Sequence, residues 1–269
     1  MERSDDFYIV LPSNSSMSFF PNNTTTNYTT HLPREVKLDG DWDVGLAEIH
    51  IPCTVNHIQE SEAIIAYAYE KPGESGPSEG GYIFPHGHYE SLTELADCIN
   101  TCILNSPYAA KLVPSTDRKG YWELQYRSMA SGYHVLKFSD KVCEIFGFDR
   151  EVGELSRIMP IGEENQIIKA ERPASLARAI PDQLFVYTDI CESYIVGDTQ
   201  ASLLRIVSLD SSKYTFGSNI VRQFSPAQFI PLMKHQFQTI LIDIRDILGK
   251  PVPFQFGSLI VKLHMKKRY

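Results

Sequence analysis

Gln238-Thr-Ile-Leu-Ile-Asp-Ile-Arg245 is the stretch from which the fold class follows most directly. Its isoleucines, Ile240, Ile242 and Ile244, recur at every second position, as they do when one face of a strand is buried. The stretch 258–265 repeats this pattern with four apolar side chains of one parity. Between the two lies a turn in which Gly249 is free to adopt a positive φ angle. The C-terminal end of the chain therefore predicts two β-strands joined by a turn.

Other segments of the chain also have the composition and pattern of β-strands. Aromatic residues make up 11% of the chain, and many stand in short β-branched runs, which favours sheets. Further strands are predicted at 7–12, 42–51, 63–69, 183–190 and 202–208. Many short strands with long, irregular connections predict a mainly β fold, a β-sandwich with crossing connections rather than an up-and-down barrel.

Residues 81–150 have a different pattern and predict a small α+β subdomain inserted into the sandwich. Ser91-Leu-Thr-Glu94 has the form of a helix capping box, and apolar residues at helical spacing follow it as far as Ile103. A second short helix, at 141–146, is capped by Ser139-Asp140 and ends at Gly147. Together with strands at 82–84, 121–127 and 133–138, the predicted order is β-α-β-β-α. The expected domains are 1–80 and 151–269, which form the sandwich, and the insert 81–150.

Composition narrows the class of protein without indicating a function. Of the 269 residues, 43% are hydrophobic and 22% are charged, and the net charge is −8. These values are typical of a globular protein, and an isoelectric point near 5.5 argues against a protein that coats nucleic acid. No apolar run reaches the roughly 18 residues of a membrane span, and no signal peptide is recognisable. The five cysteines predict buried free thiols in a reducing compartment.

Two groups of residues have the side chains of a metal site, but each is short of ligands. His86-Gly-His88 offers two imidazoles without a neighbouring cysteine or acid, so a surface loop is the simpler interpretation. Cys98 and Cys102 are four residues apart on the first predicted helix and would need two further ligands, so core packing is favoured. We therefore expect no metal at either group.

Acidic and nucleophilic candidates are equally incomplete. Asp189, Glu192 and Asp198 flank a strand end and have the chemistry for Ca²⁺, although solvated turn charges explain them as well. Cys143, near a helix start, is the candidate nucleophile of a cysteine hydrolase, but nothing local places a base beside it. Phosphate-binding, nucleophile-elbow and zinc-protease motifs are absent from the sequence. We therefore expect no enzyme and assign no catalytic, cofactor-binding or metal-binding residues.

The C-terminal end is basic although the whole chain is acidic. Lys262 and His264 share one strand parity, and Lys266, Lys267 and Arg268 follow. This asymmetry allows contact with nucleic acid or an acidic partner, while a solvated strand face with a frayed end is the simpler interpretation. The polar run 13–30, read as an extended arm or an edge segment, also contains glycosylation sequons at Asn14, Asn22, Asn23 and Asn27, which we expect to remain polar loop.

Several stretches together resemble the penton (minor capsid) proteins of Polinton/Maverick elements and adintovirus-like viruses. The resemblance covers most of the chain outside the insert and the loop after it, and none of its stretches is a catalytic motif. They are Leu11-Pro-Ser-Asn-Ser-Ser-Met17, Phe20-Pro-Asn-Asn-Thr24, Leu38-Asp-Gly-Asp-Trp-Asp-Val-Gly-Leu-Ala-Glu-Ile49, Phe185-Val-Tyr-Thr-Asp-Ile190, Leu203-Leu-Arg-Ile-Val207, Phe237-Gln-Thr-Ile-Leu-Ile-Asp-Ile-Arg-Asp246, Gly249-Lys-Pro-Val-Pro-Phe254 and Val261-Lys-Leu-His264.

The resemblance implies a single jelly-roll β-sandwich that forms homopentamers at icosahedral vertices. The expected partners are other copies of the chain and a separate double-jelly-roll major capsid protein, and the expected location is the virion, assembled inside the host cell. The insert could contact a host-cell surface molecule or simply widen the plug, and direct nucleic-acid contact is expected only through the basic C-terminus. No cofactor and no membrane span are implied.

Two alternatives from other classes stay open on the sequence alone. One is a β-sandwich binding module that recognises a glycan or a protein through the insert and its loops. The other is a hydrolase that depends on Cys143. The oligomeric state separates the capsid and binding-module hypotheses, and replacement of Cys143 by alanine tests the hydrolase.

Overall fold

The chain divides into two compact units. The structure is a computed structural model that describes residues 5–69, 78–104, 109–127, 134–148, 154–155 and 166–269. One unit, which we call the sandwich unit, combines Met1–Val55 with Pro181–Tyr269, and the other, the inserted unit, comprises Asn56–Ile180. Each unit has its own core and is described by itself below.

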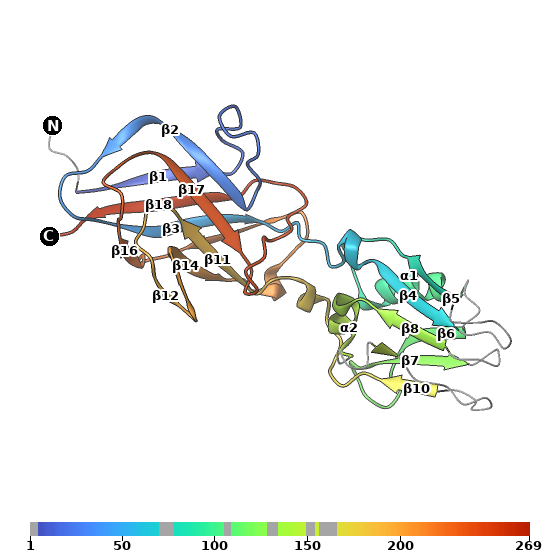
Figure 1. Cartoon of the computed structure of the whole chain (residues 1–269). Helices are drawn as coiled ribbons and strands as arrows, with labels where there is room; N and C mark the ends of the chain where they lie inside the picture. The colour runs from blue at the N-terminus through green and yellow to red at the C-terminus, as the bar shows by residue number, and fades with distance from the viewer. Residues whose placement is uncertain (1–4, 70–77, 105–108, 128–133, 149–153, 156–165) are drawn as a thin grey trace. The chain divides into compact units, whose positions relative to one another are not determined.

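Two antiparallel sheets face each other in the sandwich unit (Figure 1). The first sheet has the order β1 (Asp6–Pro12), β18 (Ile260–Lys267), β3 (Trp42–Pro52) and β15 (Asn219–Gln223), with β16 (Phe229–Pro231) also paired to β3. The second has the order β14 (Leu203–Ser208), β11 (Gln183–Thr188), β17 (Gln236–Arg245) and β2 (Asn27–Lys37). A separate hairpin consists of β12 (Tyr194–Val196) and β13 (Thr199–Ala201), and a short 3₁₀ turn, η3, spans Ser211–Lys213.

The strand order is that of a single jelly roll. Leaving out β16 and the hairpin, eight strands of the described sandwich unit are β1, β2, β3, β11, β14, β15, β17 and β18 in chain order. The first sheet takes the first, eighth, third and sixth of them, and the second takes the fifth, fourth, seventh and second. Apart from β11 and β14, which pair with each other, consecutive strands of these eight lie in opposite sheets, and this gives the crossing connections expected from the sequence. The inserted unit falls between the third strand, β3, and the fourth, β11.

Alternating apolar residues fill the space between the two sheets. Ile240, Ile242 and Ile244 of β17 are fully buried, which confirms the buried face predicted from their spacing. A buried aliphatic side chain of this size contributes about 1.5–3 kcal/mol. Tyr28 of β2 is also fully buried, and its hydroxyl donates to the Leu11 carbonyl oxygen of β1 at 2.9 Å, which ties the two sheets together.

The described part of the inserted unit contains two small sheets and two helices (Figure 1). Its sheets have the orders β10-β7-β6 and β5-β4-β8-β9. The strands are β4 (Ile64–Tyr69), β5 (Ser78–Ile83), β6 (Ala109–Pro114), β7 (Trp122–Arg127), β8 (His134–Phe138), β9 (Glu154–Leu155) and β10 (Gln166–Lys169). The helices are α1 (Leu92–Leu104) and α2 (Asp140–Phe146), and 3₁₀ turns lie at η1 (Glu60–Glu62) and η2 (Leu176–Ala179).

The inserted unit is longer than the segment 81–150 expected from the sequence. Strand β4, which was assigned to the sandwich, pairs with β5 and β8, and β10 pairs with β7. Alternation of apolar residues marks a strand but does not say which sheet it joins, so the boundary could not be read from the pattern. The expected β-α-β-β-α order also omitted β6 (Ala109–Pro114), a short strand that pairs along its length with β7.

Helix capping follows the sequence closely. The Ser91 hydroxyl accepts a hydrogen bond from the Glu94 amide at 3.1 Å, while the Glu94 carboxylate reaches back to the Glu90 amide rather than to that of Ser91. At α2, Ser139 accepts from the Val142 amide, and Gly147 ends the helix with a φ angle of +81°. Both helices therefore begin at their expected capping residues.

Candidate functional site

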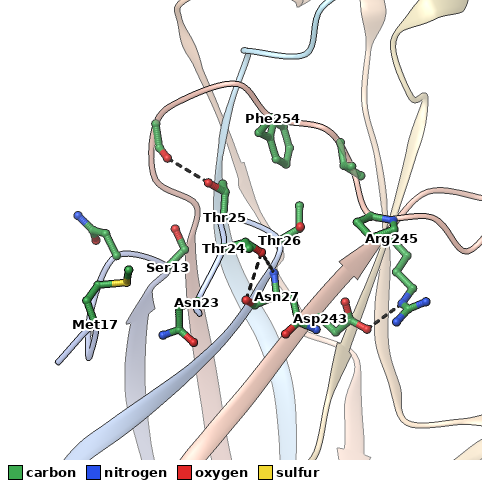
Figure 2. Close-up of a pocket in the computed structure, with 14 residues that line it drawn as sticks. Ser13, Met17, Asn23, Thr24, Thr25, Thr26, Asn27, Asp243, Arg245 and Phe254 are labelled. Atoms are coloured by element: carbon green, nitrogen blue, oxygen red, sulfur yellow. Dashed lines mark hydrogen bonds and ion pairs between the residues drawn. The ribbon is translucent and has the colours of Figure 1, made fainter. Parts of the chain in front are cut away.

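A pocket with a mixed polar and apolar lining lies at one end of the sandwich unit (Figure 2). It has a volume of about 680 Å³ and opens to solvent. One wall is the β1–β2 connection with the start of β2, and the other is the end of β17 with the β17–β18 connection. The lining residues are Ser13, Asn14, Met17, Asn23, Thr24, Thr25, Thr26, Asn27, Asp243, Arg245, Pro251, Val252, Phe254 and Gly257.

Local hydrogen bonds hold the first wall of this pocket in shape. The Asn23 side chain accepts from the Thr29 amide and donates to the Thr29 carbonyl oxygen, both at 2.9 Å. The Thr24 hydroxyl accepts from the Asn27 amide at 3.0 Å. Such side-chain bonds to nearby backbone order a connection without secondary structure. The polar run 13–30, which the sequence left open as an arm or an edge segment, is thus partly a folded connection and partly strand β2.

The two walls are also tied to each other. The Ser13 hydroxyl accepts from the Leu259 amide at 3.0 Å, and the Ser13 amide donates to the Leu259 carbonyl oxygen at 2.8 Å. The Thr25 hydroxyl donates to the Gly257 carbonyl oxygen at 3.3 Å, a contact drawn in Figure 2. Because both walls are hydrogen-bonded across the gap, the pocket is preformed.

One ion pair lies among the residues that line the pocket. Arg245 Nε donates to Asp243 Oδ2 at 2.7 Å (Figure 2). Arg245 Nη1 donates to the Gly249 carbonyl oxygen at 3.0 Å. Gly249 has the positive φ angle that the sequence indicated, +73°. The carboxylate and the guanidinium neutralise each other, so the pocket presents fixed polar groups without a net charge.

A second candidate surface is the outer face of the first sheet. His264 of β18 stacks on Tyr8 with ring centroids 4.4 Å apart, and Phe229 meets the same imidazole edge-on at 5.2 Å. Lys262 lies 4.9 Å from the centre of the Tyr8 ring. Tyr8 and the neighbouring outward residue Val10 are each 54% exposed. Aromatic and cationic side chains in this combination are common in protein interfaces.

The basic C-terminal residues thus divide between this face and an ion pair. His264 Nε2 lies 3.2 Å from Asp6 Oδ2, and the Arg268 guanidinium pairs with Asp43. Lys262 and His264 lie at alternate positions of β18 that are not buried, as their common parity predicted, and Lys266 follows them on the same face. Arg268 is therefore held against the sheet rather than in a frayed end.

His88 pairs with a histidine that the sequence analysis did not single out. His86 is exposed, whereas His88 stacks on the buried His57 with ring centroids 4.3 Å apart. The Tyr89 amide donates to His57 Nδ1 at 3.0 Å. Burial, and then the neighbouring His88, lower the pKa of His57 to about 4. The sequence missed His57 because it lies some thirty residues before its partner and outside any spaced motif.

The cysteines have the environment of core residues. All five are free thiols, and Cys53, Cys143 and Cys191 are buried, while Cys98 and Cys102 are half-buried on α1. Burial raises the pKa of Cys143 to about 11, so the thiol stays protonated at neutral pH. A thiol with a raised pKa is a poor nucleophile, which weakens the hydrolase hypothesis.

The acidic candidates are not brought together as ligands. Asp189 Oδ2 pairs with Lys234, and its Oδ1 accepts from the Leu241 amide at 2.8 Å. Glu192 is exposed, and Asp198 lies exposed in the turn between β12 and β13. Within the described ranges, no group of three or more His, Cys, Asp or Glu side chains has the arrangement of a metal site. Of the four sequon asparagines, Asn23 is half-buried by its backbone bonds and the other three are exposed.

No helix in the part of the chain that the structure describes is long and apolar enough to cross a membrane. No family model matches the sequence, and no curated protein does.

Among solved structures, the mavirus penton protein is similar to this chain. The two share 10% sequence identity with a TM-score of 0.51, and the alignment covers 98% of this chain and 99% of the mavirus chain. A chain in the cryo-EM structure of the Sputnik virophage aligns over 99% of this chain and 100% of its own, also at 10% identity, with a TM-score of 0.45. At this identity the mavirus match concerns the fold, which the chain shares over almost its whole length with a penton protein.

Proposed function

We propose that the protein is a capsid vertex subunit that assembles into a homopentamer and closes the five-fold vertices of an icosahedral shell. The observation that supports this most is the likeness to the mavirus penton protein, because it extends over nearly all of both chains and so includes the insertion. The jelly-roll strand order and the resemblance of the strand sequences to Polinton/Maverick and adintovirus-like penton proteins support it independently.

A five-membered ring requires a heterologous interface, in which one patch of each copy meets a different patch of the next copy. The sandwich unit has two chemically unlike outer faces that suit this role. The first sheet carries the aromatic and cationic group around His264, and the second sheet presents Phe185 and Leu241 at half-buried, outward positions. We propose that these faces meet in the ring.

Further parts of the proposal follow from the vertex role. The partner in the shell is a double-jelly-roll major capsid protein, the location is the virion, and the chain itself catalyses no reaction. The inserted unit is available for contact with a host-cell surface molecule, and nucleic-acid contact is confined to the basic C-terminus. The protonated Cys143 is consistent with a structural role.

The assembly state tests the vertex proposal. Mass photometry and light scattering of the purified chain, alone and mixed with the double-jelly-roll protein from the same source, are expected to detect a species of about 150 kDa, five copies of a 30.5-kDa chain. A chain that stays monomeric at micromolar concentration in both conditions would contradict the proposal.

Substitution on the outer face of the first sheet is expected to weaken assembly. Replacing both Tyr8 and Val10 by serine removes two side chains that are each 54% exposed and leaves the core unchanged. Loss of such contacts from an interface costs about 1–2 kcal/mol, so the midpoint of assembly should rise about tenfold in concentration. Ile167→Ser, at a 50% exposed position of the inserted unit, serves as the control. Equal assembly of the double variant and the wild-type chain would exclude this face from the interface.

A further inference from the structure

The pocket at the end of the sandwich unit has a chemistry that the vertex role does not use. Its lining combines four hydroxyl side chains, three amides and one ion pair with an apolar edge that includes Met17, Val252 and Phe254. We infer that this pocket binds a neutral saccharide. The inference stands on the pocket alone and does not depend on the proposed assembly.

The charge of the pocket argues for a neutral ligand. Among the lining residues that the structure describes, Asp243 and Arg245 are the only ionised ones, and they pair at 2.7 Å. A phosphate or sulfate would meet the Asp243 carboxylate without an excess of cations to offset the repulsion. A lipid chain would cover the side-chain amides of Asn14 and Asn27 without offering them hydrogen-bond partners, and covering an unpaired polar group costs free energy. A sugar ring has hydroxyl groups at its edge, which can bind the polar lining residues, and C–H groups on its faces, which can pack against the apolar ones.

Several groups remain available for such a ligand. In the described part of the chain, the side-chain amides of Asn14 and Asn27 have no hydrogen-bond partner, and both residues are exposed. Asp243 uses Oδ2 for Arg245, which leaves Oδ1 as an acceptor. An amide donates and accepts, and a carboxylate accepts, so together they match hydroxyl groups, which also do both. Asn27 and Asp243 belong to opposite walls and are paired in register between β2 and β17, and Figure 2 shows them close together.

The fixed walls lower the cost of binding. Thr25 and Gly257 join the walls, and Asn23 and Thr24 hold the β1–β2 connection through backbone bonds. Groups ordered in advance lose little conformational entropy when the ligand arrives. The volume of about 680 Å³ lies within the usual range of small-ligand sites and accommodates a short oligosaccharide.

Saturation-transfer NMR on the full-length protein tests the inference directly. The probes are lactose, maltose and N,N′-diacetylchitobiose at millimolar concentration, with 3′-sialyllactose and inorganic phosphate as anionic probes. We expect saturation transfer to at least one neutral disaccharide and none specific to the anions. Asp243→Asn keeps the side-chain shape but removes the carboxylate, and Asn27→Ala removes the amide. Each variant should weaken binding of that disaccharide at least fivefold.

Asn219→Ala is the matched control, because Asn219 is an exposed asparagine on β15 that is not among the pocket-lining residues, and it should bind as the wild-type chain does. Thermal unfolding of all variants separates a lost contact from a lost fold. The inference is overturned if no neutral disaccharide binds, if only sialyllactose or phosphate binds, or if folded Asp243→Asn and Asn27→Ala both keep wild-type affinity. Because binding is measured on the chain alone, failure here is distinguishable from failure to form pentamers.

Discussion

Replacing Gly147 by alanine is expected to destabilise the inserted unit by about 3 kcal/mol. Gly147 has a φ angle of +81°, and a Cβ atom there would lie 2.0 Å from the carbonyl oxygen of Arg172. Relief requires movement of the backbone of the segment that donates the Glu171 and Arg172 amides to the Gly147 carbonyl oxygen. The substitution therefore combines a disfavoured backbone conformation with a clash that no side-chain rotation can relieve.

The two tryptophans allow each unit to be followed separately. Trp122 belongs to the inserted unit and Trp42 to the sandwich unit, so Trp122 fluorescence in a Trp42→Phe background reports urea unfolding of the inserted unit. Gly120→Ala is the matched control, with a φ angle of +83° and a nearest contact at 3.9 Å. It should cost only about 1 kcal/mol. Equal unfolding midpoints for the two alanine variants would contradict the proposed clash.

Acidification from pH 6.5 to about pH 4 is expected to lower the unfolding free energy of the inserted unit by about 2 kcal/mol. The pKa of His57 falls from 6.5 to about 4 in the folded protein, first because of burial and then because of His88. Since the unfolded chain binds this proton at a higher pH than the folded chain, the stabilising contribution is complete above about pH 6.5. It is lost as the pH falls toward the folded pKa. Partial solvent screening keeps the loss below the full value of the shift.

The same geometry explains why protonation is unfavourable. His57 Nδ1 accepts the Tyr89 amide, so a proton at that nitrogen removes a buried hydrogen bond, and a positive ring would face His88. The pKa of His88 is also lowered by burial, while Glu94 and Glu90 oppose this effect. Nearby carboxylates thus reduce the acid sensitivity without removing it.

Urea unfolding between pH 4 and pH 7, followed through Trp122, measures this dependence. His57→Asn places an amide oxygen where Nδ1 accepts, and the amide does not titrate. The unfolding free energy of this variant should therefore change less between pH 4 and pH 7 than that of the wild-type chain. His86→Asn changes an exposed histidine and is expected to keep the wild-type profile. If the unfolding free energy of His57→Asn changed with pH as steeply as that of the wild-type chain, His57 would be excluded as the cause of the acid sensitivity.

Two strands show where a local sequence pattern is not sufficient to predict the structure. In β2 only Tyr28, Thr30 and Leu32 are buried, and two of these three are polar or carry a hydroxyl, so the run looks like a loop until β17 pairs with it. Residues 63–69 were recognised as a strand but assigned to the wrong unit. Pairing partners come from distant parts of the chain, and a local pattern does not contain them.

The pocket could not be predicted from the sequence for the same reason. Its walls are contributed by residues 13–27 and 243–257, which lie at opposite ends of the chain and meet because β1 pairs with β18 and β2 with β17. The hydroxyl and amide run at 13–30 was the one local signal, and by itself it was equally compatible with a polar arm.

By itself, the sequence determined the mainly β class, the buried faces of β17 and β18, the caps of both helices and the presence of an α+β insert. Each depends on spacing within one element, where side-chain direction follows directly from residue number. Only the tertiary structure decided the jelly-roll strand order, the limits of the inserted unit, the His57–His88 pair and the pocket. These depend on contacts between segments far apart in sequence, which form because burial of the apolar faces selects one pairing among many.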